Sequence, residues 1–332
     1  MGEKSKTFPF NGLVPIDISF LDVGSVLTFP LYRRVEREHG EEEFILLANR
    51  DQKLTNQVRL LIQTDPAAQV FTKSKYVDQY NEYLQYLESH TSEILTDQSI
   101  PLKKRSNILY SLASKKMEDL FVNGISKDSF EKAVGCAEYV SDFLASNNGA
   151  LSTLMTLTTK DYKLFTHAVH VCILGLSLYH QTLYKERPDL VNDVAVGLLF
   201  HDIGKTRINQ TILKKTGMLT PTEWKIMRNH PVWGCEILRQ YGIRNSTTLD
   251  IVRYHHERLD GQGYPEGLKG NAVPYVAQIA AIADCFSAMT CNRPYNLRIN
   301  AFSTLQQMME ENQGGFWLDP DLLETFIIML GE

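Results

Sequence analysis

The pattern of hydrophobic and polar positions differs between the first ninety residues and the rest of the chain. In the first part, the apolar runs at 27–35 and 43–49 flank a polar stretch with a glycine, which predicts a β-hairpin. Short apolar runs also suit a buried helix. In the rest, apolar residues recur every three or four positions, most clearly over 107–148, where no proline interrupts them. We therefore predict three parts: a small mixed α/β domain at 1–90, a helical connector at 91–150 and a mainly helical domain at 151–332.

Composition and charge narrow the classes of protein and ligand. The chain has 332 residues, 43% of them hydrophobic, which is enough for a packed core, and a net charge of -5. Because that charge provides no basic field, we expect no DNA or RNA polymer and no membrane surface as a partner. The longest apolar tract, 275–289, contains Gln278, Asp284 and Ser287 and is too polar to span a bilayer. The start lacks the apolar core of a signal peptide, and the five cysteines form no CxxC pair, so we predict a cytoplasmic protein.

The nine histidines are unevenly distributed along the chain. Only His39 and His90 precede position 160, and the other seven lie between His167 and His256. His167 shares a helical face with Leu164 and further apolar residues, which predicts that its ring points into the core. A lone histidine on such a face is more often a packed core residue than a metal ligand. Its role therefore depends on the other donors.

Further imidazoles and carboxylates lie near the ends of predicted helices. His201 and Asp202 end the apolar helix VAVGLLF and offer a nitrogen and a carboxylate at one point; a capping aspartate beside an incidental histidine is the alternative. Asp284 lies at the predicted end of an alanine-rich helix, where a buried carboxylate is costly unless it is paired or binds metal. The presence of these donors favours the interpretation of His167 as a metal ligand.

Together the donors exceed what one tetrahedral zinc ion requires. We predict that they bind two divalent first-row metals, which share Asp202 and keep positions open for water and substrate. The predicted ligands are His167, His201, Asp202, His230, His255, His256 and Asp284.

Four motifs follow one another along the chain: HDIGK at 201–205, NHP around His230, HHERLDGQGYP at 255–265 and NRPY at 292–295. In this order they resemble the HD-GYP family, a branch of the HD-domain phosphohydrolases, over about 161–295. The resemblance implies an all-helical HD-domain bundle, a metal centre usually found with iron or manganese, and hydrolysis of the bacterial second messenger cyclic di-GMP to pGpG or GMP. Some members of the family also act on cyclic GMP-AMP.

Under this resemblance we expect a cyclic di-GMP phosphodiesterase with two divalent metals, iron or manganese. A hydroxide that bridges the metals is the expected nucleophile. The catalytic residues are Asp202, which bridges, and Lys205, which steadies a phosphate oxygen or a metal-bound water. The family pattern assigns one metal to His167, His201 and Asp284 and the other to His230, His255 and His256.

The GYP loop is expected to bind the substrate. Tyr264, which the family uses in substrate binding, can stack on a guanine and donate its hydroxyl to a phosphate. Gly261, Gly263 and Gly267 are expected to take backbone angles that are closed to other residues and to bring the main chain near the ligand. In the same resemblance, Arg293 makes a charge-assisted contact with the ligand phosphate. We expect Glu257 and Asp260 either to orient metal ligands or to hold the loop through backbone contacts.

Four positions depart from the family pattern. Lys163 replaces a glutamate that members with a third metal carry one helical turn before His167, so we predict two metals and not three. Asn296 replaces a basic residue, which should weaken phosphate binding. Gln278 and Ser287 replace an arginine and an aspartate. These changes affect substrate choice and the rate of turnover more than the metal site.

The first domain resembles the small regulatory module that often precedes HD-GYP domains. It has no catalytic set of residues, no receiver-type aspartate pocket and no glycine-rich phosphate loop. Two other functions are kept as hypotheses. One is a cyclic dinucleotide receptor with slow or no turnover that signals to a protein partner, and the other is an HD hydrolase for a nucleotide, which the GYP loop argues against. A second copy of the chain is a further candidate partner.

Overall fold

The structure is a computed structural model that describes residues 12–16, 21, 26–36, 42–55, 58, 69–157, 163–290, 300–313 and 317–331. It divides into two compact units, Met1–Ser111 and Leu112–Glu332. The division falls inside helix α4 (Leu102–Asn123), so this helix carries the chain from one unit to the next. The boundaries that we predict from the sequence, near 90 and 150, stay predictions.

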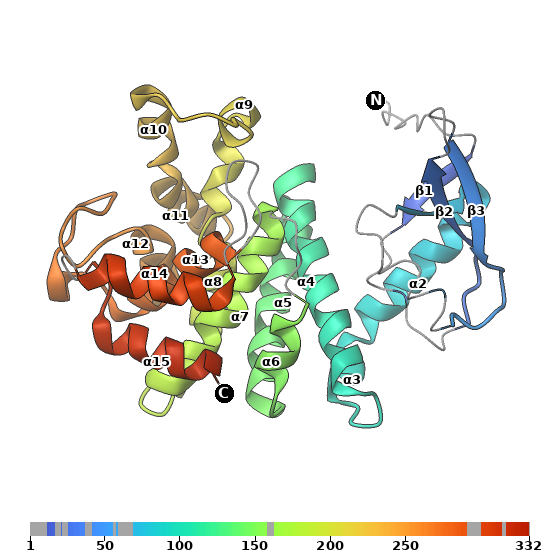
Figure 1. Cartoon of the computed structure of the whole chain (residues 1–332), viewed down its shortest axis with the longest axis horizontal. Helices are drawn as coiled ribbons and strands as arrows, with labels where there is room; N and C mark the ends of the chain where they lie inside the picture. The colour runs from blue at the N-terminus through green and yellow to red at the C-terminus, as the bar shows by residue number, and fades with distance from the viewer. Residues whose placement is uncertain are drawn as a thin grey trace. The chain divides into compact units, whose positions relative to one another are not determined.

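The first unit contains a four-stranded antiparallel sheet in the order β1-β4-β2-β3 (Figure 1). Strands β2 and β3 pair in the hairpin predicted from the sequence, with Arg34 opposite Phe44. The strands are β1 (Leu13–Ile16), β2 (Leu31–Glu36), β3 (Glu42–Ala48) and β4 (Val70–Lys73).

The sheet and the helix that follows it share a hydrophobic core. The short 3-10 turn η2 (Ser74–Tyr76) leads from β4 into α2 (Val77–Ser89), and α3 (Thr91–Thr96) comes next. The ring of Phe29 is fully buried and meets Tyr80 of α2 edge to face at 5.5 Å. The first unit therefore has a core of its own.

In the residues that the structure describes, the regular elements of the second unit are all helices and 3-10 turns (Figure 1). The predicted fold class, a mainly α bundle preceded by a small mixed α/β region, is confirmed. None of the described helices is both long and apolar enough to cross a bilayer. After α4, the helices are α5 (Lys127–Ser146), α6 (Ala150–Met155), α7 (Leu164–Thr182), α8 (Val191–Phe200), α9 (Gln210–Leu213), α10 (Pro221–Met227), α11 (His230–Gln240), α12 (Ser246–Tyr254), α13 (Tyr275–Thr290), α14 (Ala301–Gln313) and α15 (Pro320–Gly331), with 3-10 turns η3 (Pro188–Leu190), η4 (Ile203–Arg207) and η5 (Gly270–Ala272).

Helices α7, α8, α12 and α13 form the centre of this unit. Helix α8 contacts both α7 and α12, and α13 contacts α7 and α12. Glycines allow two of these contacts to be close: a Cβ on Gly175 would lie 2.6 Å from Leu198 Cδ2, and one on Gly197 would lie 2.8 Å from Ile251 Cδ1. The four helices therefore pack tightly, and most of the polar side chains that form the candidate metal centre lie on them or at their ends.

Candidate metal centre

The structure brings together all seven side chains that we predict as metal ligands, although they lie far apart in the sequence. Their donor atoms form two groups, each with all its atoms within 4.8 Å of one another. We call His167, His201 and Asp284 the first donor group, and Asp202, His230, His255 and His256 the second donor group. They come from α7, α13, the start of α11 and the residues that follow α8 and α12. Their role as ligands stays a prediction.

Asp202, a member of the second donor group, also faces the first donor group and is 1% exposed. Its Oδ2 atom is 3.4 Å from His201 Nε2 and 3.9 Å from His167 Nε2, both in the first donor group. Its Oδ1 atom is 3.2 Å from His230 Nε2 and 3.8 Å from His255 Nε2, both in the second donor group. Each carboxylate oxygen thus faces a different set of imidazoles, which is the arrangement of a bridging ligand.

Asp284 is a second carboxylate that faces both groups. Its Oδ1 atom is 2.9 Å from His167 Nε2, and its Oδ2 atom is 3.8 Å from His256 Nδ1. The prediction that Asp284 ends its helix is wrong, because α13 continues to Thr290. Phe286 is buried beyond Asp284, so the apolar face of the helix runs past the carboxylate.

Backbone carbonyls fix the tautomer of three histidines. The Nδ1 atoms of His201, His230 and His255 contact the carbonyl oxygens of Leu198, Met227 and Val252 at 2.8, 2.8 and 3.0 Å. A carbonyl oxygen only accepts, so each Nδ1 carries the proton and donates it. Each Nε2 then keeps its lone pair and points toward Asp202.

His167 is oriented by a side chain from another helix. Its Nδ1 atom lies 2.9 Å from the hydroxyl of Ser287, which is 1% exposed on α13. Ser287 is one of the departures from the family pattern, and its contact with His167 spans 120 positions of sequence. A hydroxyl can donate or accept, so it holds the ring with less preference for one tautomer than a carboxylate would.

Burial sets the protonation of the imidazoles. It lowers the pKa of His167, His230, His255 and His256, the last to about 3, so these rings are neutral at pH 7 and able to bind a metal. At His201, burial is outweighed by the nearby Asp202, so the pKa of that imidazole is raised.

The two carboxylates stay charged despite their burial. At Asp202, burial favours the neutral form, but Lys205 and His201 hold the pKa of the carboxyl well below its usual range. At Asp284, His167 has the same effect on the carboxyl pKa. The centre therefore presents two anionic carboxylates and four neutral imidazoles, beside His201, whose pKa is raised.

This donor set fits divalent metal ions. The buried Nε2 of His201 and Oδ1 of Asp202 make no hydrogen bond to any residue that the structure describes. Buried polar atoms without a partner are costly unless another species satisfies them. Five imidazoles with two carboxylates are ligands that first-row divalent metals accept, so the chemistry of the donor set fits a divalent metal site.

Lys205 contacts the central carboxylate. Its Nζ atom is 2.5 Å from Asp202 Oδ2, and its side chain is 15% exposed. We predict from the sequence that Lys205 steadies a phosphate oxygen or a metal-bound water. In the structure its contact is with Asp202, three residues before it, and it thereby reaches the edge of the site.

Gly204 explains how two distant donors come close. A Cβ at this position would lie 1.9 Å from the carbonyl oxygen of His230. Only a glycine lets η4 approach the first turn of α11 so closely. This contact sets His230 beside Asp202.

Glu257 and Asp260 hold the loop that follows α12. The carboxylate of Glu257 is 3% exposed and accepts backbone N–H groups from Glu266, Gly267 and Leu268 at 2.7, 3.0 and 2.9 Å. Asp260 forms an ion pair with the neighbouring Arg258 at 2.6 Å. Of the two roles that we predict for these acids, the structure supports the stabilisation of the loop.

The glycines of the loop that follows α12 are required for different structural reasons. Gly261 and Gly267 have φ angles of 81° and 69°, which favour glycine. Gly263 has no such angle; a Cβ there would lie 2.5 Å from Glu257 Cα and 2.6 Å from the carbonyl oxygen of His256. Our prediction that Gly263 needs a special angle is therefore wrong, because the space is filled by the loop's own backbone.

Tyr264 lies beside the second donor group, and a further cation lies over it. Its ring stacks on His256 with centroids 4.6 Å apart. The guanidinium carbon of Arg228 is 5.5 Å from the Tyr264 ring centroid and 5.8 Å from that of Trp224. Arg228 is not predicted from the sequence, where its signal is its place one helical turn after Trp224 and two residues before His230.

The remaining positions singled out from the sequence are Lys163, Gln278, Arg293 and Asn296. Arg293 and Asn296 lie outside the described residues. Lys163 begins α7 with an exposed side chain whose ammonium is 5.4 Å from the Phe165 ring centroid, and the number of metals stays a prediction. Gln278 donates its amide to the Val273 carbonyl at 2.9 Å and so lies away from the donors, near the start of α13.

The comparison with known sequences identifies the family. The family described as HD domain matches residues 138–322, more than half of the chain. The chain belongs to the HD domain family. Relatives include a cyclic di-GMP phosphodiesterase of Pseudomonas aeruginosa, 35% identical over 193 residues, which are 58% of this chain and 45% of the relative. A cyclic di-GMP phosphodiesterase of Thermotoga maritima is 38% identical over 141 residues, 41% of this chain and 37% of the relative.

Other relatives are named for a different cyclic dinucleotide. A 3′3′-cGAMP-specific phosphodiesterase of Vibrio cholerae is 37% identical over 128 residues, 38% of this chain and 24% of the relative. The chain thus spans less than half the length of these relatives. Among solved structures, an HDG"Y"P protein of Bdellovibrio bacteriovorus has a TM-score of 0.72 at 19% identity and covers 96% of this chain and 100% of its own. The HD domain protein therefore has the predicted fold, and the predicted family is confirmed.

Proposed function

We propose that this HD domain protein hydrolyses a cyclic dinucleotide, cyclic di-GMP, to the linear product pGpG with the help of two divalent metals, iron or manganese. The observation that carries the proposal is the position of Asp202, whose two oxygens face two different groups of imidazoles. The relatives are named as cyclic di-GMP and 3′3′-cGAMP phosphodiesterases, which supports a cyclic dinucleotide as the class of substrate. Cytoplasmic location and a protein partner stay predictions from the sequence.

The reaction adds water across one phosphodiester bond of the ring. A new P–O bond forms from the water oxygen, the P–O bond to the 3′ oxygen breaks, and that oxygen takes up a proton. Divalent metals held by the two donor groups would make water nucleophilic at neutral pH and neutralise charge on the phosphoryl group. A second hydrolysis of the linear product would give GMP.

Lys205 binds a phosphate oxygen in this proposal. Its ammonium touches Asp202 Oδ2 at 2.5 Å and is partly exposed, so it lies where the buried donors meet solvent. A cation in that position attracts the phosphodiester and lowers the cost of charge that develops during the attack. The contact with Asp202 also keeps the carboxylate ionised.

Tyr264 and Arg228 bind the rest of the nucleotide in this proposal. Both side chains present flat groups next to His256: a phenol ring and a guanidinium 5.5 Å from its centroid. Aromatic rings and guanidinium planes stack on bases, and a guanidinium also pairs with phosphate. Arg293, from the family resemblance, adds a phosphate contact, and Gly263 lets the loop fold closely on its own backbone beside Tyr264.

The test is a product assay under anaerobic conditions. The full chain is loaded with ferrous iron or manganese, cyclic di-GMP is added, and the products are resolved over time. We expect pGpG to appear only when metal is present, and none in a variant with His201→Ala and Asp202→Ala. Substitution of 3′3′-cGAMP in the same assay measures the preference between substrates.

Two results would contradict the proposal. One is tight binding of intact cyclic di-GMP without product in protein shown to contain its metals, which would favour a receptor. The other is hydrolysis of mononucleotides alone, which would favour a different HD hydrolase.

A further inference from the structure

A cavity lies in the first unit, apart from the metal-centre residues. It has a volume of ≈ 360 Å³ and opens on the sheet, between β1, β2, β3 and the η2 turn after β4. That volume is within the range of pockets that hold small organic molecules, about 300–1,000 Å³. The metal centre does not explain this cavity, because none of its lining residues belongs to either donor group.

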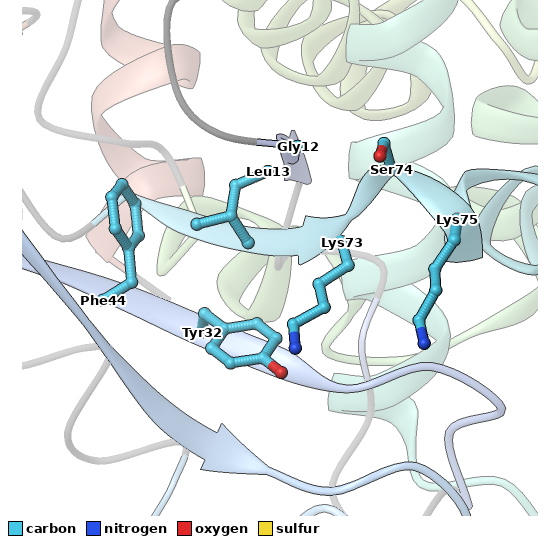
Figure 2. A pocket seen from close by; sticks show the side chains of 7 residues that line it. All are labelled: Gly12, Leu13, Tyr32, Phe44, Lys73, Ser74 and Lys75. Atoms are coloured by element: carbon cyan, nitrogen blue, oxygen red, sulfur yellow. The ribbon is translucent and has the colours of Figure 1, made fainter.

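The cavity is apolar at one end and cationic at the other. Figure 2 shows Leu13 and Phe44 at one end, the side chains of Lys73 and Lys75 at the other, and Tyr32 between them. The ring of Phe44 is held edge to face against Phe71 at 5.1 Å, so the apolar end has a fixed wall. Such a division matches a ligand that is itself apolar at one end and charged at the other.

The two lysines are held in place by rings and not by acids. Lys73 Nζ lies 5.3 Å from the centroid of the Tyr32 ring, and Lys75 Nζ lies 4.9 Å from that of Tyr76. Among the described residues, no carboxylate forms an ion pair with either lysine. Lys73 ends β4 and Lys75 lies in η2, and Figure 2 shows both side chains extending to the same side. Two unneutralised like charges on one side favour an anion between them.

We propose that this cavity binds a small organic anion with an apolar or aromatic body. The charged group lies between Lys73 and Lys75, and the body lies against Leu13 and Phe44. Two sources supply this chemistry: a nucleoside monophosphate, with a base and a phosphate, or a medium-chain carboxylate. The proposal concerns binding to the first unit and does not depend on the activity of the metal centre.

The test measures binding to the full chain that carries His201→Ala and Asp202→Ala, so that the metal centre cannot consume the probe. Isothermal titration is done separately with GMP, octanoate and inorganic phosphate. The test variant adds Lys73→Ala and Lys75→Ala. The control variant instead adds Lys53→Ala and Lys103→Ala, which remove the same charge from exposed positions outside the cavity.

We expect GMP or octanoate to bind, and which of them binds identifies the source. The loss of two charge-assisted contacts should weaken that binding by roughly tenfold or more, whereas the control should change it less than roughly twofold. Phe44→Ala should lower the binding affinity for the organic anion and leave the affinity for inorganic phosphate unchanged.

The proposal is overturned if neither organic anion binds, or if binding is equal in the test and control variants. It is also overturned if inorganic phosphate binds as tightly as the organic anions, because the apolar end of the cavity would then contribute nothing to the binding affinity. Since no product is measured, each outcome leaves the proposed phosphodiesterase activity untouched.

Discussion

The helix ends around Asp202 and the loop that follows His256 hold the site in different ways. At the helix ends, His201, His230 and His255 are each fixed by the carbonyl oxygen of the residue three positions earlier in the chain. In the loop, one carboxylate, Glu257, accepts backbone N–H groups from residues nine to eleven positions later. These three donors are thus fixed by local hydrogen bonds, whereas the loop, which binds substrate in the proposed function, is held by longer-range contacts of the buried Glu257 carboxylate.

This difference separates metal binding from substrate binding. A change at the helix ends should reduce metal content and all activity that depends on it. A change in the loop should alter the affinity for the dinucleotide while the metals stay bound. The predictions below test that separation, from the largest expected effect to the smallest.

The largest effect is expected from Asp202→Asn, which keeps the shape of the side chain and removes its charge. Even the loss of residues that only orient metal ligands costs about 10–100-fold in affinity or activity, so loss of the shared carboxylate should cost more than roughly 100-fold. Metal content and the rate of pGpG formation measure this. Asp321→Asn on the exposed side of α15 is the control, and a variant at Asp202 with full metal content would contradict the bridging role.

Gly204→Ala should separate the donors without removing any of them. The new Cβ would meet the His230 carbonyl oxygen at 1.9 Å, so η4 and α11 must move apart. We expect the free energy of unfolding to fall by about 1–3 kcal/mol or more, together with weaker metal binding. Chemical denaturation measures the first and metal titration the second. Gly217→Ala, whose Cβ would meet nothing within 4 Å, should change neither.

Glu257→Gln should loosen the loop and leave the metals in place. The amide lacks the charge that attracts three N–H groups, and the loss of such contacts costs about 1–3 kcal/mol. Faster hydrogen exchange at Glu266, Gly267 and Leu268, with a higher KM and unchanged metal content, is the expected result. Glu236→Gln on the surface is the control. Loss of metal in the Glu257 variant would show that the loop and the centre are not separate.

Arg228→Ala should weaken the binding of the dinucleotide. A guanidinium over an aromatic ring contributes about 0.5–2 kcal/mol, which corresponds to a rise in KM of roughly 2–30-fold. Arg239→Ala, on the exposed side of α11, is the matched control. If kcat falls and KM does not change, Arg228 acts on the chemical step and our assignment is wrong.

Ser287→Ala is expected to have the smallest effect. It removes the partner of His167 Nδ1 and leaves the ring in its buried place. A single hydrogen bond of this kind contributes about 1 kcal/mol, or roughly a fivefold loss of metal affinity in the first donor group. Metal titration measures it. An effect as large as that of Asp202→Asn would mean that Ser287 is itself a ligand.

The donor residues could be predicted from the sequence because their signals are local. His201 and Asp202 end an apolar helix, and His255 and His256 end another, so residue type and position along the helix mark them together. The hairpin β2–β3 is predictable for the same reason, since its two strands flank one polar turn.

The remaining features depend on contacts that no local pattern records. Ser287 reaches His167 across 120 positions, and Arg228 meets Tyr264 only because α10 and the loop come together in space. Gly263 has an ordinary backbone angle, so only the neighbouring backbone shows why it lacks a side chain. Asp284 lies inside its helix because burial continues beyond it.

The most direct test of the central claim is a crystal structure of the full chain grown with manganese, in which anomalous scattering locates each metal. We predict two peaks on either side of Asp202, one next to His167, His201 and Asp284 and the other next to His230, His255 and His256. A single peak, or one that Asp202 does not touch, would contradict the two-metal site on which the proposed function rests.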